Sequence, residues 1–187
     1  MKPGQALYKI TQALRLDPST LLKIYALESY PIDEKRLKAI LKKPSAKGHE
    51  NATYEELGVF LDGLIRLRRG EPKNPPPEDA EIELDNNLIL KKLRIALELK
   101  EMDLEVIFEM GERPLSRSQL RDLFRNPTHP KYLPCSDAVL NDFLLGLEEY
   151  RADMPPVGGR KRKAESGEQR AKSLEPRAES LKRKAES

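Results

Sequence analysis

Two histidines and one cysteine are the strongest candidates for catalytic or metal-binding chemistry in this sequence. They are His49, His129 and Cys135, and they lie in segments between predicted helices. A metal centre needs several N, S or O ligands that converge at close spacing, and these three do not show that pattern. Cys135 would be a nucleophile if His129 reached it; the simpler interpretation is a small apolar residue beside a helix cap. With no glycine-rich phosphate-binding motif either, we expect no metal, no cofactor and no enzymatic activity.

A second candidate chemistry is electrostatic. Two predicted helices, 34–43 and 117–126, carry matching basic pairs, Lys38 with Lys42 and Arg121 with Arg125. Residues four apart share one helix face. Each helix follows another after a proline-containing turn, in outline like a helix-turn-helix whose second helix contacts DNA. The cationic surface would extend over Lys91, Lys92 and Arg94. The alternative is that these residues only solubilise exposed helices.

The charge of the chain is unevenly distributed. The net charge is +3, but residues 158–187 contain ten Lys/Arg and five Asp/Glu, so the remainder is at −2. The basic isoelectric point therefore describes the C-terminal segment. A single cysteine, no apolar leader and no apolar run of the ~20 residues that a membrane span needs predict a cytoplasmic protein without membrane contact.

The sequence repeats itself. A shift of 83 positions aligns residues 4–70 with 87–153 without a gap, and the matched apolar residues include Leu7 with Leu90, Leu14 with Leu97, Ile24 with Ile107, Leu57 with Leu140 and Phe60 with Phe143. Such self-similarity is the signature of a duplicated structural unit.

The sequence pattern within each copy predicts four short helices. Their ranges are 4–15, 18–28, 34–43 and one beginning at Thr53 in the first copy, and 86–99, 101–110, 117–126 and one beginning at Ser136 in the second. Asp17 before Pro18, Thr53 with Glu56 and Ser116 with Gln119 are cap signals, and Pro44 and Pro127 stop the third helices. A glycine at both 63 and 146, inside the fourth helices, predicts close helix packing.

These patterns predict an all-α protein with two tandem four-helix repeats, 4–70 and 85–153, packed as one pseudo-twofold unit. The proline-rich segment 71–84 is an expected linker. Within residues 154–187, Ala-x-Ser recurs every seven residues from Ala164 to Ser187, but the segment carries too few apolar residues for a coiled coil. We therefore expect a disordered basic tail.

The second copy carries a signature that resembles the YehS-like bacterial family, a duplicated helical domain of unknown function. The signature runs through Asp85-Asn86-Asn87, Leu90-Lys91-Lys92-Leu93-Arg94-Ile95-Ala96-Leu97, Asp103, Ile107-Phe108, Tyr132, Cys135-Ser136-Asp137 and Phe143-Leu144-x-Gly146-Leu147. The resemblance implies a duplicated helical architecture and a bacterial cytoplasmic setting, and it supplies no activity. Copy one departs from the motif, with Ala52 and Tyr54 in place of Cys135 and Asp137, so a polar site tied to it would lie in copy two.

The polar motif positions are Asn86, Asn87, Asp103, Cys135 and Asp137. Asn86 and Asn87 are interpreted as an N-cap pair or, alternatively, as a ligand contact at a helix N-terminus. Asp137 is interpreted as a favourable first-turn acid. Our leading hypothesis is a non-enzymatic binding protein that engages another protein through a groove between the copies. The alternative is a nucleic-acid-binding protein that uses the third helix of each copy. The oligomeric state stays open.

Overall fold

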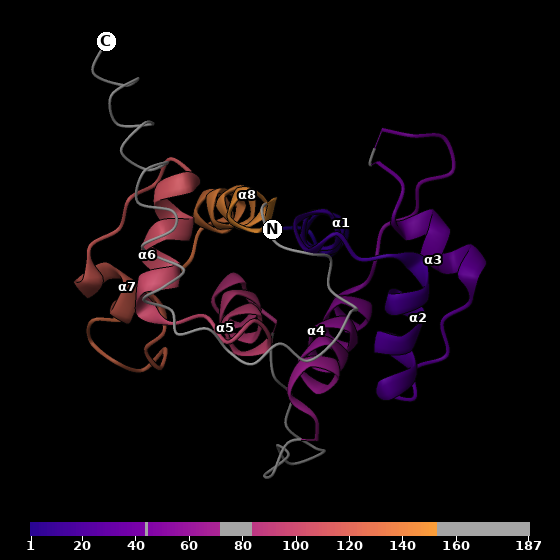
Figure 1. Ribbon diagram of the computed structural model, residues 1–187, viewed down its shortest axis with the longest axis horizontal. Coiled ribbons are helices and arrows are strands. Elements are labelled where there is room, and N and C mark those ends of the chain that lie inside the picture. Colours follow the sequence, from indigo (N-terminus) through magenta and orange to yellow (C-terminus); the bar gives the residue numbers. More distant parts are fainter. Residues whose placement is uncertain (44, 72–83, 153–187) are drawn as a thin grey trace. The chain divides into compact units, whose positions relative to one another are not determined.

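The computed structural model describes residues 1–43, 45–71 and 84–152. All regular elements in these ranges are α-helices, which confirms the all-α class (Figure 1). They are α1 (Pro3–Leu14), α2 (Pro18–Leu27), α3 (Glu34–Ile40), α4 (Tyr54–Arg69), α5 (Asn86–Ala96), α6 (Glu101–Met110), α7 (Arg117–Leu123) and α8 (Asp137–Ala152). Most of the predicted linker 71–84 and all of the predicted tail 154–187 lie outside the described residues.

The predicted caps begin the helices where the sequence places them. Asp17 accepts a hydrogen bond from the Thr20 amide at 3.0 Å at the start of α2. The capping boxes at Thr53 and Ser116 are both formed, at the starts of α4 and α7. The prediction was wrong at α5, where Asp85 is the N-cap and accepts from the Leu88 amide at 2.7 Å. Asp85 caps this helix because its carboxylate reaches the third helical amide.

Helices α3 and α7 are shorter than predicted. Both have seven residues and end at Ile40 and Leu123, three residues before the predicted ends. Pro44 and Pro127 follow at i+4, where a proline ring clashes with the carbonyl of the residue four positions earlier and offers no amide to it. The prolines therefore limit how far both helices could continue, and the helices end one turn before them.

The turns after the first and second helices of each copy repeat the same backbone conformation. Arg15 and Glu98 have φ angles of 51° and 55°, and Ser29 and Glu112 have 54° and 58°. Each pair is 83 residues apart, the spacing of the sequence repeat. A positive φ is unusual for residues other than glycine, so its recurrence at both pairs shows that the copies share their turns as well as their helices.

The structure divides into two compact units, Met1–Glu98 and Leu99–Ser187. The first contains α1 to α5, and the second contains α6 to α8. Helix α5 begins the second sequence copy, yet it packs against α4 of the first. The first unit therefore includes one helix more than the sequence copy that it contains.

Helix α4 is the central element of the first unit. Helices α1, α2 and α5 pack against it, and Phe60 and Leu64 on α4 are fully buried. A Cβ atom at Gly63 would clash with the backbone carbonyl oxygen of Ile24 on α2. The predicted close packing at Gly63 is confirmed, because only hydrogen fits between the two helices there.

The second unit is built on the contact between α6 and α8. Gly146 on α8 lies against the backbone of Ile107, where a Cβ atom would clash with the carbonyl oxygen. Phe108 and Phe143 are fully buried beside this crossing, with ring centroids 5.4 Å apart. The glycine contact is thus the same in both copies, at positions 63 and 146.

Candidate functional site

Asp103 is the one buried carboxylate of the second unit among the described residues, with 5% of its surface exposed. It accepts hydrogen bonds from the Tyr150 hydroxyl at 2.7 Å and from the Lys100 amide at 2.8 Å. The first bond joins the start of α6 to the last turn of α8, and the second caps α6. Both are structural roles, since they hold the carboxylate between two helices.

Cys135 is buried, with 6% exposed, directly before Ser136 at the start of α8. Ala52, at the matching position of copy one, is also buried. The ring of His129 is engaged elsewhere, by the Lys131 amide at 3.0 Å and the Arg125 guanidinium at 3.1 Å. These contacts support the interpretation of Cys135 as a small apolar residue.

The motif positions of the second unit lie at opposite ends of α8. Asp103 contacts Tyr150 at the C-terminal end of α8, whereas Cys135 and the exposed Asp137 lie at the N-terminal end of α8. A helix of sixteen residues is about 24 Å long. Asp103 therefore forms no common site with Cys135 and Asp137.

Asn86 and Asn87 are the first residues of α5 and not its cap. Oδ1 of Asn86 accepts a hydrogen bond from the amino group of Met1 at 2.9 Å, and Asn87 is half-buried. Asn86 thus ties the start of α5 to the start of the chain within the first unit.

No cluster that could hold a metal ion, meaning three or more His, Cys, Asp or Glu side chains, occurs in the described ranges. No helix of the described segments is long and apolar enough to cross a membrane.

The matching basic pairs do not form i, i+4 pairs on a helix. Lys38 lies on α3 and Arg121 on α7, but Lys42 and Arg125 lie beyond the helix ends. Lys38 forms an ion pair with Glu34 at 2.8 Å, and Arg125 forms one with Asp122 at 2.6 Å. Arg121 is exposed. The predicted common cationic face is therefore reduced by intramolecular pairing and by the prolines that shorten both helices.

The basic residues of α5 differ in their surroundings. Nζ of Lys92 lies 2.6 Å from the Asp62 carboxylate of α4, and the Lys92 side chain is half-buried. Lys91 is exposed and Arg94 is half-buried. Lys92 therefore joins α5 to α4, and its charge is already balanced.

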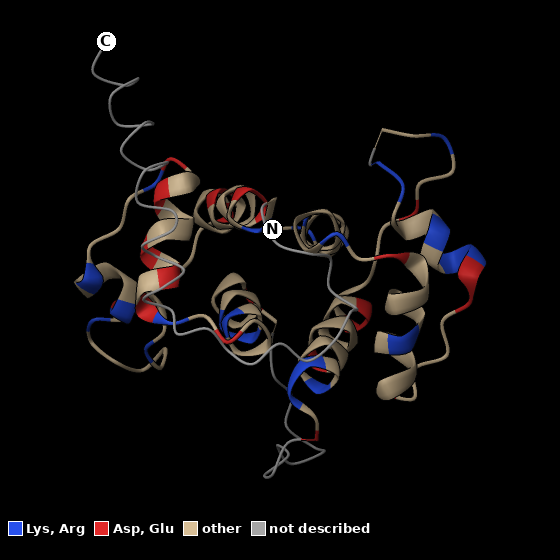
Figure 2. Cartoon of the chain, viewed as in Figure 1, with Lys and Arg blue, Asp and Glu red and all other residues tan. Residues whose placement is uncertain are grey.

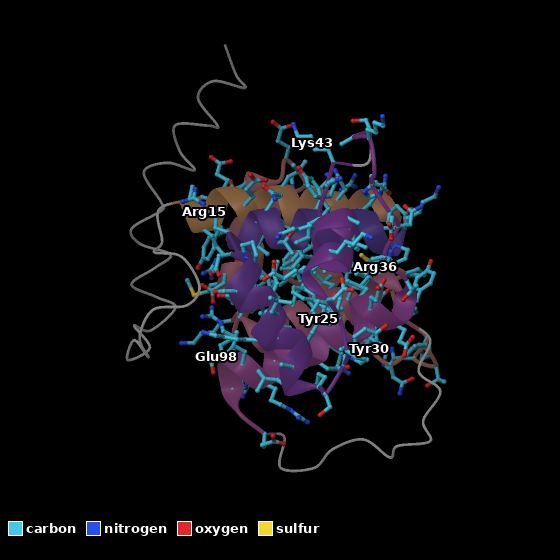
Figure 3. All side chains as sticks on the ribbon, turned by 90° about the vertical axis from the view of Figure 1, so that its right-hand side faces the viewer. Arg15, Tyr25, Tyr30, Arg36, Lys43 and Glu98 are labelled. Atoms are coloured by element: carbon cyan, nitrogen blue, oxygen red, sulfur yellow. The ribbon has the colours of Figure 1, made fainter. Side chains whose placement is uncertain are left out.

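Sequence reasoning missed an ion-pair network in the first unit, around Arg36 of α3. Its Nε and Nη2 donate to both oxygens of Glu56 on α4, at 2.8 and 2.9 Å. Nη2 also donates to the carbonyl of Asn51 at 3.0 Å, and Nη1 pairs with Glu50. The fork of one arginine thus joins α3, the loop before α4 and α4 itself. Figure 3 shows Arg36 in the same unit as Tyr25 and Tyr30.

Glu56 is buried, with 4% exposed. Burial raises the pKa of its carboxyl, but hydrogen bonds from Arg36 and from the Thr53 amide lower it by more, so the net pKa lies below the ordinary value. The capping box with Thr53 was a visible signal for Glu56. Nothing in the local pattern indicated that Arg36, twenty residues earlier, reaches the same carboxylate.

The two units carry opposite net charges. The described residues of the first unit contain sixteen Lys/Arg and eleven Asp/Glu, a net +5. Those of the second contain seven and ten, a net −3. Figure 2 marks basic residues in blue on α3 and the loop after it, and acidic residues in red along α6. The described parts of the two units therefore differ in the sign of their net charge.

Comparison with known proteins places this architecture in a family. The family model described as "Protein of unknown function (DUF1456)" matches residues 5–70 and again 86–151. The chain is similar to the uncharacterized protein YehS of Escherichia coli (strain K12), with 30% identity over 147 residues, which cover 79% of this chain and 94% of that protein. No solved structure matches the chain. With the model found twice over most of its length, the chain belongs to the DUF1456 family and carries two copies of its domain in tandem.

Proposed function

We propose that this chain is a non-enzymatic binding protein that engages another protein through the outer face of α8. The proposal is supported by the roles of its polar side chains. Asp103 and Glu56 are buried in contacts that hold helices together, and Cys135 is buried as well. Such groups stabilise the fold and are not presented to a substrate.

The observation that carries the proposal is the exposure of Leu145, of which 48% is accessible on α8. Single exposed leucines are common on protein surfaces. The sequence repeat allows Leu145 to be compared with the equivalent residue of copy one. That residue is Asp62 on α4, which forms an ion pair with Lys92. Copy two thus carries an apolar side chain where copy one has a polar contact.

The residues around Leu145 indicate the chemistry of the partner surface. Glu148 and Glu149 follow one turn later on α8, on the same side of the helix. Glu148 is exposed, and the second unit is acidic. An apolar anchor beside acidic residues fits a protein surface with a small apolar pocket and a basic rim.

Site-specific photo-crosslinking tests this proposal. A photoreactive residue at position 145 of the full chain should give one discrete adduct in cells, and the same residue at the exposed position Ser118 of α7 should not. The captured protein, once purified, should bind the Leu145→Glu variant at least tenfold more weakly than the parent. The absence of an adduct at 145, or equal affinity for the variant, would refute the proposal.

The alternative, in which α3 and α7 together bind nucleic acid, stays a prediction. Part of the positive charge that this alternative requires is neutralised within the chain, since Lys38, Lys92 and Arg125 each form an ion pair with a carboxylate.

A further inference from the structure

The loop between α3 and α4 concentrates positive charge in the first unit. Lys42, Lys43 and Lys47 lie within six residues, and all three are exposed. We call the described residues of this segment, 42–43 and 45–49, the lysine loop. Figure 3 shows Lys43 at the edge of the unit, away from the helical body that contains Tyr25.

Hydrogen bonds fold the lysine loop back on itself. Nζ of Lys42 donates to the carbonyl of Lys47 at 3.3 Å, and Nδ1 of His49 lies 3.0 Å from the carbonyl of Lys42. The Ala46 amide donates to the carbonyl of Lys43 at 2.8 Å. These bonds cross the loop, so they keep its lysines close to one another.

The carboxylates closest in sequence to the lysine loop on either side, Glu34 and Glu50, are already engaged. Glu34 forms an ion pair with Lys38, and Glu50 with Arg36. Within the part of the chain that the structure describes, no carboxylate oxygen lies within ion-pair distance of the ammonium groups of the lysine loop. The loop therefore presents its charge to an outside anion.

Copy two has no counterpart of the lysine loop. The positions equivalent to Lys42, Lys43 and Lys47 hold Arg125, Asn126 and Pro130. Arg125 is in turn paired with Asp122. The cluster is thus a property of copy one, although copy two carries the more complete family motif.

We propose that the lysine loop binds the phosphate backbone of a nucleic acid without reading its base sequence. Lysine binds phosphate as a compact point charge, and backbone contacts carry no sequence information. An acidic protein is the less favoured partner, because the other residues from 44 to 49 (Pro44, Ser45, Ala46, Gly48 and His49) supply no large apolar side chain for the core of a protein interface. The lysine loop is separate from Leu145, so this proposal does not depend on the protein-binding one.

The decisive comparison uses two triple variants of the full chain. Lys42, Lys43 and Lys47 are replaced by Gln in the first, and Lys2, Lys23 and Lys131, all exposed, in the control. Binding of a labelled 20-nucleotide RNA and a 20-base-pair DNA is measured against salt concentration. Each lost phosphate contact lowers the logarithmic salt slope by about 0.7 to 0.9, so the loop variant should lose two to three units of slope, or about a hundredfold in affinity at 0.1 M salt. The control should bind as the parent does.

Lysine footprinting on the unmodified chain gives a second measurement that does not depend on the folding of a variant. Acetylation of the three loop lysines should slow at least threefold in the presence of the nucleic acid. The two probes distinguish RNA from DNA as the source of the phosphates. Equal binding by the two triple variants, or protection confined to the basic residues of 158–187, would overturn the proposal. It would also be overturned if polyglutamate competed as well as RNA at equal charge concentration, which would indicate an acidic protein partner.

Discussion

Substitution of Gly63 by alanine tests the helix packing of the first unit most directly. The added methyl group would lie against the carbonyl oxygen of Ile24. This oxygen belongs to the backbone of α2, so it cannot move aside as the end of a side chain could. Helices α2 and α4 would have to separate, and the fully buried side chains of Ile24, Tyr25 and Phe60 would lose contact area.

The magnitude follows from two opposing effects. Alanine is favoured over glycine inside a helix by about 1 kcal/mol. Overpacking at a tight contact typically costs about 1–3 kcal/mol and occasionally more, and a clash with a rigid backbone belongs at the upper end. We expect Gly63→Ala to lower the free energy of unfolding by about 1–2 kcal/mol, after the helix-propensity gain.

A matched control lies on the same helix. At Gly58 an added Cβ atom would meet only a side-chain atom of Leu84, at 4.0 Å, so Gly58→Ala should stabilise the unit by up to about 1 kcal/mol. Urea unfolding followed by circular dichroism measures both variants, and hydrogen exchange of α2 and α4 assigns the change to the first unit. The reasoning is refuted if Gly63→Ala proves as stable as the parent or shifts in the same direction as the control.

Three further predictions follow from buried polar contacts and from the unit boundary. The pKa of Glu56 is lowered in the folded chain. Its carboxylate therefore stabilises the fold at a pH above the unfolded value of about 4.3, and this stabilisation is lost as the pH falls through the folded value. When the parent and Glu56→Gln are unfolded at decreasing pH, the variant should lose less of its free energy of unfolding. Tyr150→Phe removes the hydroxyl that donates to the buried Asp103 and should cost about 1–3 kcal/mol, measured by urea unfolding, whereas an unchanged midpoint would contradict the structural role of this bond. A fragment that ends after α5 should unfold cooperatively in urea, and one that ends after α4 should not, because it lacks the helix that covers α4; equal cooperativity would show that α5 is dispensable.

Features that depend on neighbouring residues could be predicted from the amino-acid sequence. Asp17, Thr53 and Ser116 cap their helices as predicted, because each cap bonds an amide only three residues away. The register of 83 residues predicted the matching glycine contacts at 63 and 146. Each copy repeats the same apolar positions and turns, so the all-α class and the number of helices could be predicted.

Which helices pack together and which charges form pairs could not be predicted in this way, because both depend on how the chain folds. The packing of α5 on α4 could not be predicted from the repeat. An apolar face indicates that a helix is buried, but not which helix it packs against. Arg36 reaches Glu56 over twenty residues, and Lys92 reaches Asp62 over thirty. Ion pairs of this kind depend on the distances between helices, not on their periodicity. The sequence pattern therefore suggested more unpaired charge on the basic helices than the structure shows. It singled out Lys42 but did not indicate that Lys43 and Lys47 share a loop with it.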